Sequence, residues 1–363
     1  MERYEGALTA LTTHFNSDGT IDYKGLERHV EYQIANGING LVPCGTTGQS
    51  PTLTWDEHNE INRRVISVRD RLGSKIPVIV GAGSNNTAEA VEATKHAADD
   101  GADVTLHVTG YYNMPSQDGF ADYFEQVADA APIGVLVYNI PGRGHPIIQA
   151  DVMAALAKAK PNIWGTKDAT GGRARPDDEY ASFWKAVRHE ARKRGLADNE
   201  YLILSGDDPV TFYMMTAPEI AANGVISVWS NIFPYVYSEM TSAILKGEYH
   251  RAKEINESLK ELNGLVGARG SYVRKIGNEE LTIVDDNFRN PQPVQFAAYL
   301  LGMSESLALR SPMRAPPPEI QQQVGSALYN LHEKQPDYFE PMQKHFNPKP
   351  VVADRLMFYR NAA

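Results

Sequence analysis

The chain has 363 residues, of which 42% are apolar and 22% charged, and its formal net charge is −10. This composition is ordinary for a soluble globular protein and supplies enough apolar material for a large core. The acidic balance argues against nucleic acid or an anionic membrane as a partner, and we find no apolar run long enough to cross a membrane. Cys44 is the single cysteine, which excludes an internal disulfide, and the N-terminus does not read as a signal peptide. We therefore expect a cytoplasmic protein.

Short apolar runs alternate with longer amphipathic segments through the first 230 residues. The runs are rich in β-branched residues, which is typical of strands buried on both faces. They cover residues 6–11, 40–43, 77–80, 103–108, 133–137, 162–165, 201–204 and 224–228.

The segments between these runs carry helix start and stop signals. Thr54 followed by Glu57 is a capping-box pattern, Asn36-Gly37 is a helix-end pattern, and Pro234 suits a first helical turn. Strands that alternate with helices predict a (β/α)₈ TIM barrel over residues 1–250. An open doubly wound sheet is the competing architecture.

Strand signals nearly vanish beyond about residue 250. We expect a C-terminal helical region over residues 251–335. Its helices are predicted at 248–265, 291–303 and 318–333. The tail at 336–363 contains prolines that forbid a long helix and aromatic residues that predict docking on a surface. Residues 171–199 form a long charged connection, which we predict to be one exposed helix.

Candidate reactive side chains follow several of the predicted strands, where a barrel places its active site. Lys167 follows the sixth strand, and burial there would lower the pKa of its amine and leave a nucleophile for a 2-oxo acid. Tyr138, one strand over, is a candidate acid or base. The hydroxyls of Thr46 and Tyr112 are candidates to pass the proton.

Two further features suit carboxylate groups. The backbone N–H groups of Thr46 and Thr47 are placed to form a small anion nest. Arg143, beside a proline-glycine turn, is placed to bind a second carboxylate with two hydrogen bonds.

Plainer interpretations stay open for the same residues. Lys167 would be a solvated loop residue, Tyr138 and Tyr112 would be rim aromatics, and the segment 45–48 would be a tight turn. That segment lacks the Gly-Lys-Ser/Thr ending of a phosphate loop. The pairs Asp207-Asp208 and Asp285-Asp286 lack nearby histidine or carboxylate partners, so we expect no metal.

Several motifs occur together in a fixed order. They are Gly45-Thr-Thr-Gly48, Tyr111-Tyr-Asn113, Tyr138-Asn-Ile-Pro141, Gly165-Thr-Lys-Asp-Ala-Thr-Gly171, Ser205-Gly-Asp-Asp208, Gly224-Val-Ile-Ser-Val228 and Leu309-Arg-Ser-Pro312. Over roughly residues 5–330 the chain resembles the dihydrodipicolinate synthase / N-acetylneuraminate lyase superfamily of class I aldolases. Arg143 in Tyr-Asn-Ile-Pro-Gly-Arg is similar to the dihydrodipicolinate synthase branch.

The resemblance implies a lyase that condenses pyruvate with L-aspartate 4-semialdehyde, an early step toward diaminopimelate and lysine, with no cofactor beyond the pyruvate imine on Lys167. It implies a proton relay of Tyr138, Thr46 and Tyr112, with Tyr112 lent by a neighbouring subunit of a homotetramer. It assigns the substrate-binding residues Thr47, Arg143, Gly206 and Ile226. It also implies a possible lysine-inhibition site at Ser50, Trp55, His58, Asn85, Glu89 and Tyr111; interface packing is the alternative for this set.

The chain also departs from the family pattern. Gln49 replaces the usual glutamate, Gly144-His145 replaces the usual threonine-glycine, and both the 171–199 connection and the C-terminal tail are longer. Another 2-oxo acid aldolase or dehydratase, with a sugar-acid substrate, therefore stays open. So does a non-catalytic scaffold that binds a small acid.

Overall fold

The computed structural model describes residues 4–108, 110–143, 146–170, 177–197 and 200–360. Eight parallel strands form one sheet in the order β2-β1-β8-β7-β6-β5-β4-β3. A bridge between Leu41 and Val78 joins β2 to β3, so the sheet curls into a nearly closed barrel. This confirms the predicted TIM barrel over the open sheet.

The strands are short, as the apolar runs predicted. They are β1 (Gly6–Ala10), β2 (Gly40–Val42), β3 (Ile79–Gly81), β4 (Val104–Val108), β5 (Gly134–Asn139), β6 (Ile163–Asp168), β7 (Leu202–Ser205) and β8 (Gly224–Ser227).

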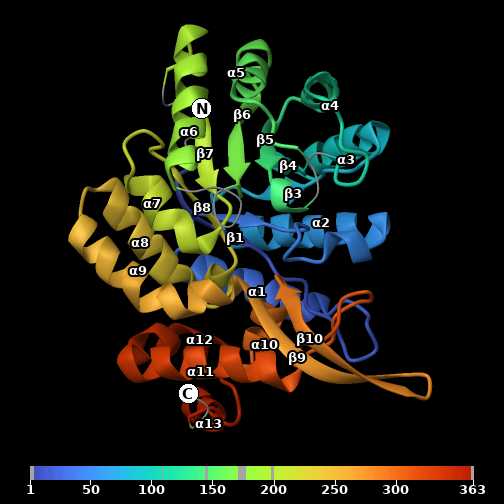
Figure 1. Ribbon diagram of the computed structural model, residues 1–363, viewed down its shortest axis with the longest axis vertical. Helices are drawn as coiled ribbons and strands as arrows, with labels where there is room; N and C mark the ends of the chain where they lie inside the picture. The colour runs from blue at the N-terminus through green and yellow to red at the C-terminus, as the bar shows by residue number, and fades with distance from the viewer. Residues whose placement is uncertain (1–3, 109, 144–145, 171–176, 198–199, 361–363) are drawn as a thin grey trace.

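Eight helices follow these strands and surround the barrel (Figure 1). They are α1 (Tyr23–Ala35), α2 (Trp55–Arg71), α3 (Thr87–Asp99), α4 (Gln117–Ala130), α5 (Ala150–Ala159), α6 (Asp177–Lys193), α7 (Thr211–Thr216) and α8 (Pro234–Leu245). The predicted end signals are confirmed. Thr54 and Glu57 form a capping box on α2, and Asn36 caps α1 before Gly37 at a φ of 74°.

Alternation along the strands decides which side chains face the interior of the barrel. On β5, Val135 and Val137 pack into the outer core beneath the helices, whereas Leu136 and Tyr138 belong to the inner cluster. The register pairs Tyr138 with Lys167 on β6. Both side chains therefore reach the interior near its carboxyl end.

The long connection after β6 contains α6, but the prediction that this helix is exposed is wrong for one face. Trp184, Val187 and Ala191 are buried in the core. They follow the three- and four-residue spacing of an amphipathic helix, so the sequence did carry this signal. Residues 171–176 and 198–199 of the connection lie outside the described residues.

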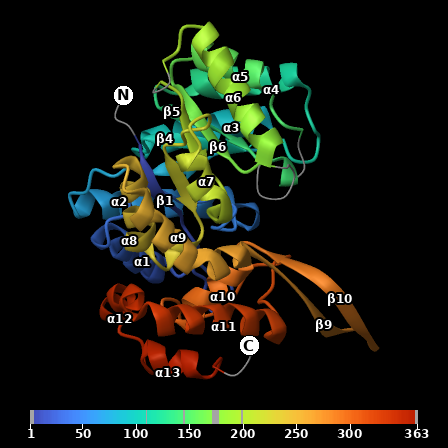
Figure 2. The same cartoon turned by 60° about the vertical axis from the view of Figure 1, so that its left-hand side comes forward.

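A β-hairpin interrupts the region predicted to be helical, and this expectation was wrong. Strands β9 (Gly267–Ile276) and β10 (Glu279–Arg289) pair antiparallel, with Gly277 at a φ of 60° in the turn between them. The hairpin extends away from the body of the molecule (Figures 1 and 2), and its base returns toward the barrel. The dipeptide Gly277-Asn278 between two alternating segments was the missed signal.

The remaining C-terminal helices form a layer beside α8 and the hairpin base (Figure 2). They are α9 (Tyr249–Asn263), α10 (Gln292–Leu300), α11 (Pro318–Lys334), α12 (Glu340–Phe346) and α13 (Val352–Met357). The docked tail is confirmed, because Tyr338, Phe339 and Phe346 are buried. Among the described residues, no helix has the length and apolarity needed to span a membrane.

Candidate active site

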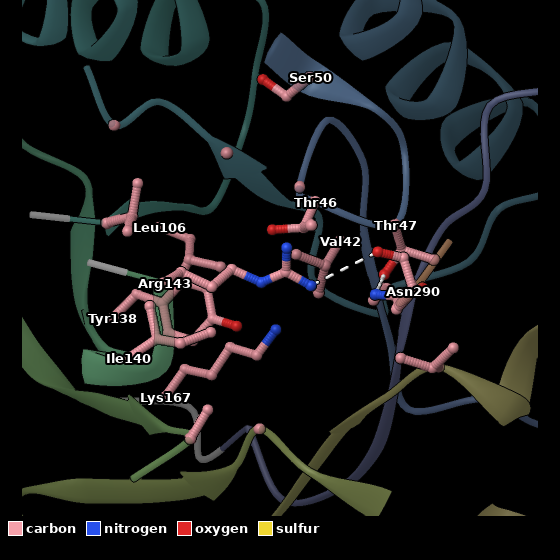
Figure 3. A pocket seen from close by; sticks show the side chains of 18 of the residues that line it. Val42, Thr46, Thr47, Ser50, Leu106, Tyr138, Ile140, Arg143, Lys167 and Asn290 are labelled. Atoms are coloured by element: carbon pink, nitrogen blue, oxygen red, sulfur yellow. Dashed lines mark hydrogen bonds between the residues drawn. The ribbon is translucent and has the colours of Figure 1, made fainter. Parts of the chain in front are cut away.

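Lys167 lies at the carboxyl end of β6 inside the barrel. Its side chain is only 7% exposed, and its Nζ lies 4.4 Å from the centre of the Tyr138 ring. Figure 3 shows the Lys167 amine, the Tyr138 hydroxyl and the Arg143 guanidinium directed into the same space. The structure therefore brings together the three side chains on which the predicted chemistry depends.

Burial controls the charge of the Lys167 amine. Loss of water lowers its pKa from 10.5 to about 8, although the nearby Asp207 and Asp208 carboxylates oppose this change. The positive charge of Arg143 lowers the pKa further. A large fraction of the amine is thus neutral in mildly alkaline solution, as a nucleophile must be.

Tyr138 is a buried phenol at the same depth. Burial raises its pKa above the ordinary value, while the charge of Arg143 acts in the opposite direction. The free site therefore keeps this hydroxyl protonated at neutral pH. The Tyr138 hydroxyl can donate a hydrogen bond to a substrate oxygen beside Lys167. Once it has transferred its proton, the phenoxide can accept a proton in a later step.

The loop after β2 carries Thr46 and Thr47. Thr47 is buried, and its Oγ1 accepts a hydrogen bond from Asn290 Nδ2 at 2.9 Å (Figure 3). Thr13 Oγ1 donates to the Gly48 carbonyl at 2.7 Å and fixes the end of the loop. This loop presents its threonines to the cavity from the side opposite Lys167.

A cavity of about 480 Å³ connects these residues. Most predicted site residues line it. From the catalytic and substrate-binding set they are Thr46, Thr47, Tyr138, Arg143, Lys167 and Gly206, and from the proposed lysine site they are Ser50, Trp55, His58, Glu89 and Tyr111. Both sets therefore face one continuous space.

Gly206 lies where no side chain fits. Its N–H donates to the Asp168 carbonyl at 2.6 Å, and a Cβ at this position would approach that oxygen to 2.8 Å. A glycine here lets β7 and β6 stay close and leaves room beside Lys167.

Three predicted residues do not line the cavity in the single chain. Tyr112 is 90% exposed. Ile226 is buried within β8, and Val228 reaches the cavity wall instead. Asn85 contributes indirectly, because its Oδ1 accepts a hydrogen bond from the Tyr111 N–H at 2.8 Å.

The far end of the cavity has its own polar groups. Ser84 Oγ donates to Glu89 Oε2 at 2.7 Å. Burial lowers the pKa of His58 to about 4, so its imidazole is neutral at physiological pH. His58 therefore offers no positive charge to pair with Glu89, which lines the same cavity.

Sequence reasoning missed two residues at the base of the hairpin. Arg289 and Asn290 line the cavity from the end of β10. Arg289 Nη1 donates to the Gly142 carbonyl at 3.3 Å, and Arg143 Nη2 donates to the Asn290 carbonyl at 3.4 Å. No local pattern predicts this contact, since the two segments are far apart in sequence.

Asp208, one of the paired aspartates considered in the sequence analysis, supports the end of β8. Its Oδ2 accepts hydrogen bonds from the N–H groups of Val228 and Trp229, each at 3.0 Å. Burial raises its pKa to about 6 despite these bonds. Within the described parts of the chain, no group of three or more histidine, cysteine or acidic residues is arranged to hold a metal ion.

Of the two substitutions that depart from the family pattern, the structure describes the one at Gln49. Gln49 Oε1 accepts from the Arg310 N–H at 3.2 Å, while the Arg310 guanidinium pairs with Glu57 at 2.6 Å. The neutral amide of Gln49 thus holds the backbone of Arg310, and Glu57 balances the charge of the Arg310 guanidinium. Gly144-His145 lies outside the described residues.

Comparison with known proteins agrees with this geometry. Residues 3–331 match the Dihydrodipicolinate synthetase family. A 4-hydroxy-tetrahydrodipicolinate synthase from Sulfurihydrogenibium sp. is 36% identical over 310 residues, which cover 85% of this chain and 92% of the relative.

Solved structures give the same result. A dihydrodipicolinate synthase from Acinetobacter baumannii, complexed with pyruvate, superposes with a TM-score of 0.75 at 30% identity, over 91% of this chain and 99% of that one. A Cyanidioschyzon merolae enzyme with lysine bound gives a TM-score of 0.76 at 31% identity, over 90% and 98% of the two chains. The chain belongs to the dihydrodipicolinate synthetase family and is a lyase of that family.

Proposed function

We propose that this cytoplasmic enzyme condenses pyruvate with L-aspartate 4-semialdehyde through an imine on Lys167. The observation that carries the proposal is the buried Lys167 amine beside Tyr138, with Arg143 at the rim of the same cavity. Relatives at 36% to 38% identity are named 4-hydroxy-tetrahydrodipicolinate synthase. A pyruvate complex of a structural neighbour further supports the choice of first substrate.

The first half of the reaction uses the neutral amine. Lys167 Nζ attacks the pyruvate carbonyl, and the resulting carbinolamine loses water to give a protonated imine. The N–H groups of Thr46 and Thr47 bind the pyruvate carboxylate. Tyr138 supplies the proton that leaves with the water. The imine joins Lys167 Nζ to the pyruvate carbon, so the proposed step uses only the enzyme's own amine and the substrate.

The second half forms the carbon–carbon bond. The iminium withdraws electrons, so the pyruvate methyl group transfers a proton to the Tyr138 phenoxide left by the first half. The resulting enamine carbon attacks the aldehyde carbon. The aldehyde oxygen takes up a proton through the hydroxyls of Tyr138, Thr46 and Tyr112. Arg143 binds the aldehyde's carboxylate and orients its carbonyl. The amino group of the condensed product then attacks the imine carbon, the bond between that carbon and Lys167 Nζ breaks, and the ring closes as the free lysine amine is regenerated.

Reductive trapping tests the proposal. Pyruvate with borohydride should add one reduced pyruvate to the wild-type chain, located on Lys167 by mass spectrometry of its peptides. Lys167→Ala should give no adduct and no turnover, whereas Lys246→Ala, which removes an exposed lysine at the end of α8, should behave as wild type. An adduct on a different lysine would contradict the assignment.

We propose that Tyr112 completes the site of a neighbouring copy in a homotetramer built as a dimer of dimers. Its 90% exposure in the single chain and its absence from the cavity lining support this role. Tyr111 and Met114, close to Tyr112 in the sequence, are exposed as well, and apolar side chains grouped on a surface mark an interaction site.

Mixing inactive variants tests this role of Tyr112. Tyr112→Phe should lower kcat by about 10²-fold, because the relay loses its hydroxyl. Co-assembly of Tyr112→Phe with Lys167→Ala should restore activity, since some sites then combine an intact lysine with an intact tyrosine. A monomer by sedimentation, with no activity regained on mixing, would sink the proposal.

We also propose that lysine binds the end of the cavity remote from Lys167. The Glu89 carboxylate suits an ammonium group, and the Cyanidioschyzon merolae neighbour was solved with lysine bound. Ser50, Trp55, His58, Asn85 and Tyr111 complete the proposed site.

Inhibition kinetics test the lysine site. Millimolar L-lysine should slow wild-type turnover, and Glu89→Gln should relieve the inhibition because the ammonium loses its charge partner. Glu92→Gln is the matched control, since Glu92 lies exposed on the same helix and pairs with Lys95. A wild-type rate unchanged by lysine would reject the site.

A further inference from the structure

Two arginines from separate parts of the fold line the cavity and are exposed at its rim. Arg143 comes from the turn after β5, a short 3₁₀ helix at Pro141–Arg143, and Arg289 ends β10 of the hairpin. Each donates to the other's segment: Arg289 to the Gly142 carbonyl at 3.3 Å, and Arg143 to the Asn290 carbonyl at 3.4 Å. The base of the hairpin is thereby joined to the turn that carries Arg143 (Figure 3).

The charge of this pair is not balanced within the described residues. No salt bridge there includes Arg143 or Arg289, whereas Arg269 on β9 of the same hairpin pairs with Asp285. Both rim arginines are exposed to solvent. Two like charges held at one rim by backbone carbonyls repel each other, and an anion bound between them would relieve that repulsion.

We propose that Arg289 is a second anion-binding residue for the substrate condensed with pyruvate. The bound group is a carboxylate at the end of the aldehyde remote from its carbonyl, held between one guanidinium from the barrel and one from the hairpin. This inference rests on the proposed function and extends it to the specificity of the second substrate.

The arrangement explains how one site prefers acidic aldehydes. A carboxylate accepts planar hydrogen bonds from guanidinium groups, which add geometric selection to charge attraction. A neutral aldehyde of the same length would leave both guanidinium charges unpaired. The binding free energy lost in this way is larger than that lost with one methylene contact. Arg289 also holds the turn at Gly142, so its substitution needs a readout that separates binding from support of the turn.

The test compares Arg289→Gln with wild type in steady-state kinetics. The KM for aspartate semialdehyde should rise about tenfold, because one charged hydrogen-bond donor is lost at an exposed rim. The KM for pyruvate and the yield of the borohydride adduct should not change. Arg289→Lys should recover part of the loss, and Lys275→Gln, on the exposed outer part of β9, is the matched control.

Butanal and salt separate recognition of the carboxylate from support of the turn. Arg289→Gln should leave kcat/KM for butanal unchanged, and rising salt should weaken semialdehyde binding more in wild type than in the variant. An unchanged semialdehyde KM in Arg289→Gln would overturn the inference. An equal loss of kcat/KM for butanal and the semialdehyde in Arg289→Gln, with no recovery in Arg289→Lys, would also overturn it. Failure of the wild-type chain to trap pyruvate would instead refute the proposed function.

Discussion

The removal of one amine from water is the constraint on which the rest of the site depends. The net effect of its surroundings, dominated by burial, makes the protonated Lys167 less favourable by about 3 kcal/mol, which corresponds to the fall of its pKa from 10.5 to about 8. The barrel achieves this because alternation along β6 directs Lys167 inward beside Tyr138. Asp207 and Asp208 limit the effect, since their charges favour the ammonium form. The result is an amine that is reactive near neutral pH and still able to regain a proton during release.

Two parts of the fold, the barrel and the base of the hairpin, line this cavity. The barrel supplies the amine, the phenol and the threonine loop, whereas the hairpin base supplies Arg289 and Asn290 at the rim. Asn290 links the hairpin base to two loops of the barrel, because its side chain donates to Thr47 and its carbonyl accepts from Arg143. We therefore propose that the covalent chemistry belongs to the barrel, and that the choice of aldehyde depends on contacts between the barrel and the C-terminal region.

Much of this arrangement could be predicted from sequence. Buried parallel strands require uniform apolar runs, so the eight strands could be placed along the sequence, with Lys167 and Tyr138 at the ends of two of them. The pattern left open whether these two side chains were buried or lay at a solvated rim, and the family resemblance favoured burial. The hairpin was missed because its outer part is exposed on both faces, and charged residues such as Arg274, Lys275 and Glu280 obscure its alternation. Arg289 and the exposed Tyr112 could not be placed in this way. Arg289 depends on contacts between distant segments, and the role proposed for Tyr112 depends on a neighbouring copy; no local pattern encodes either.

The most direct measurement is the pH dependence of imine formation in a single turnover with pyruvate, from about pH 6 to about pH 11. Only the neutral amine attacks, so the rate should rise with pH and level off above a midpoint near 8. The Tyr138→Phe variant would show whether the phenol contributes to that profile. A midpoint at the ordinary lysine value of 10.5 would mean that Lys167 stays in water, and it would contradict the account.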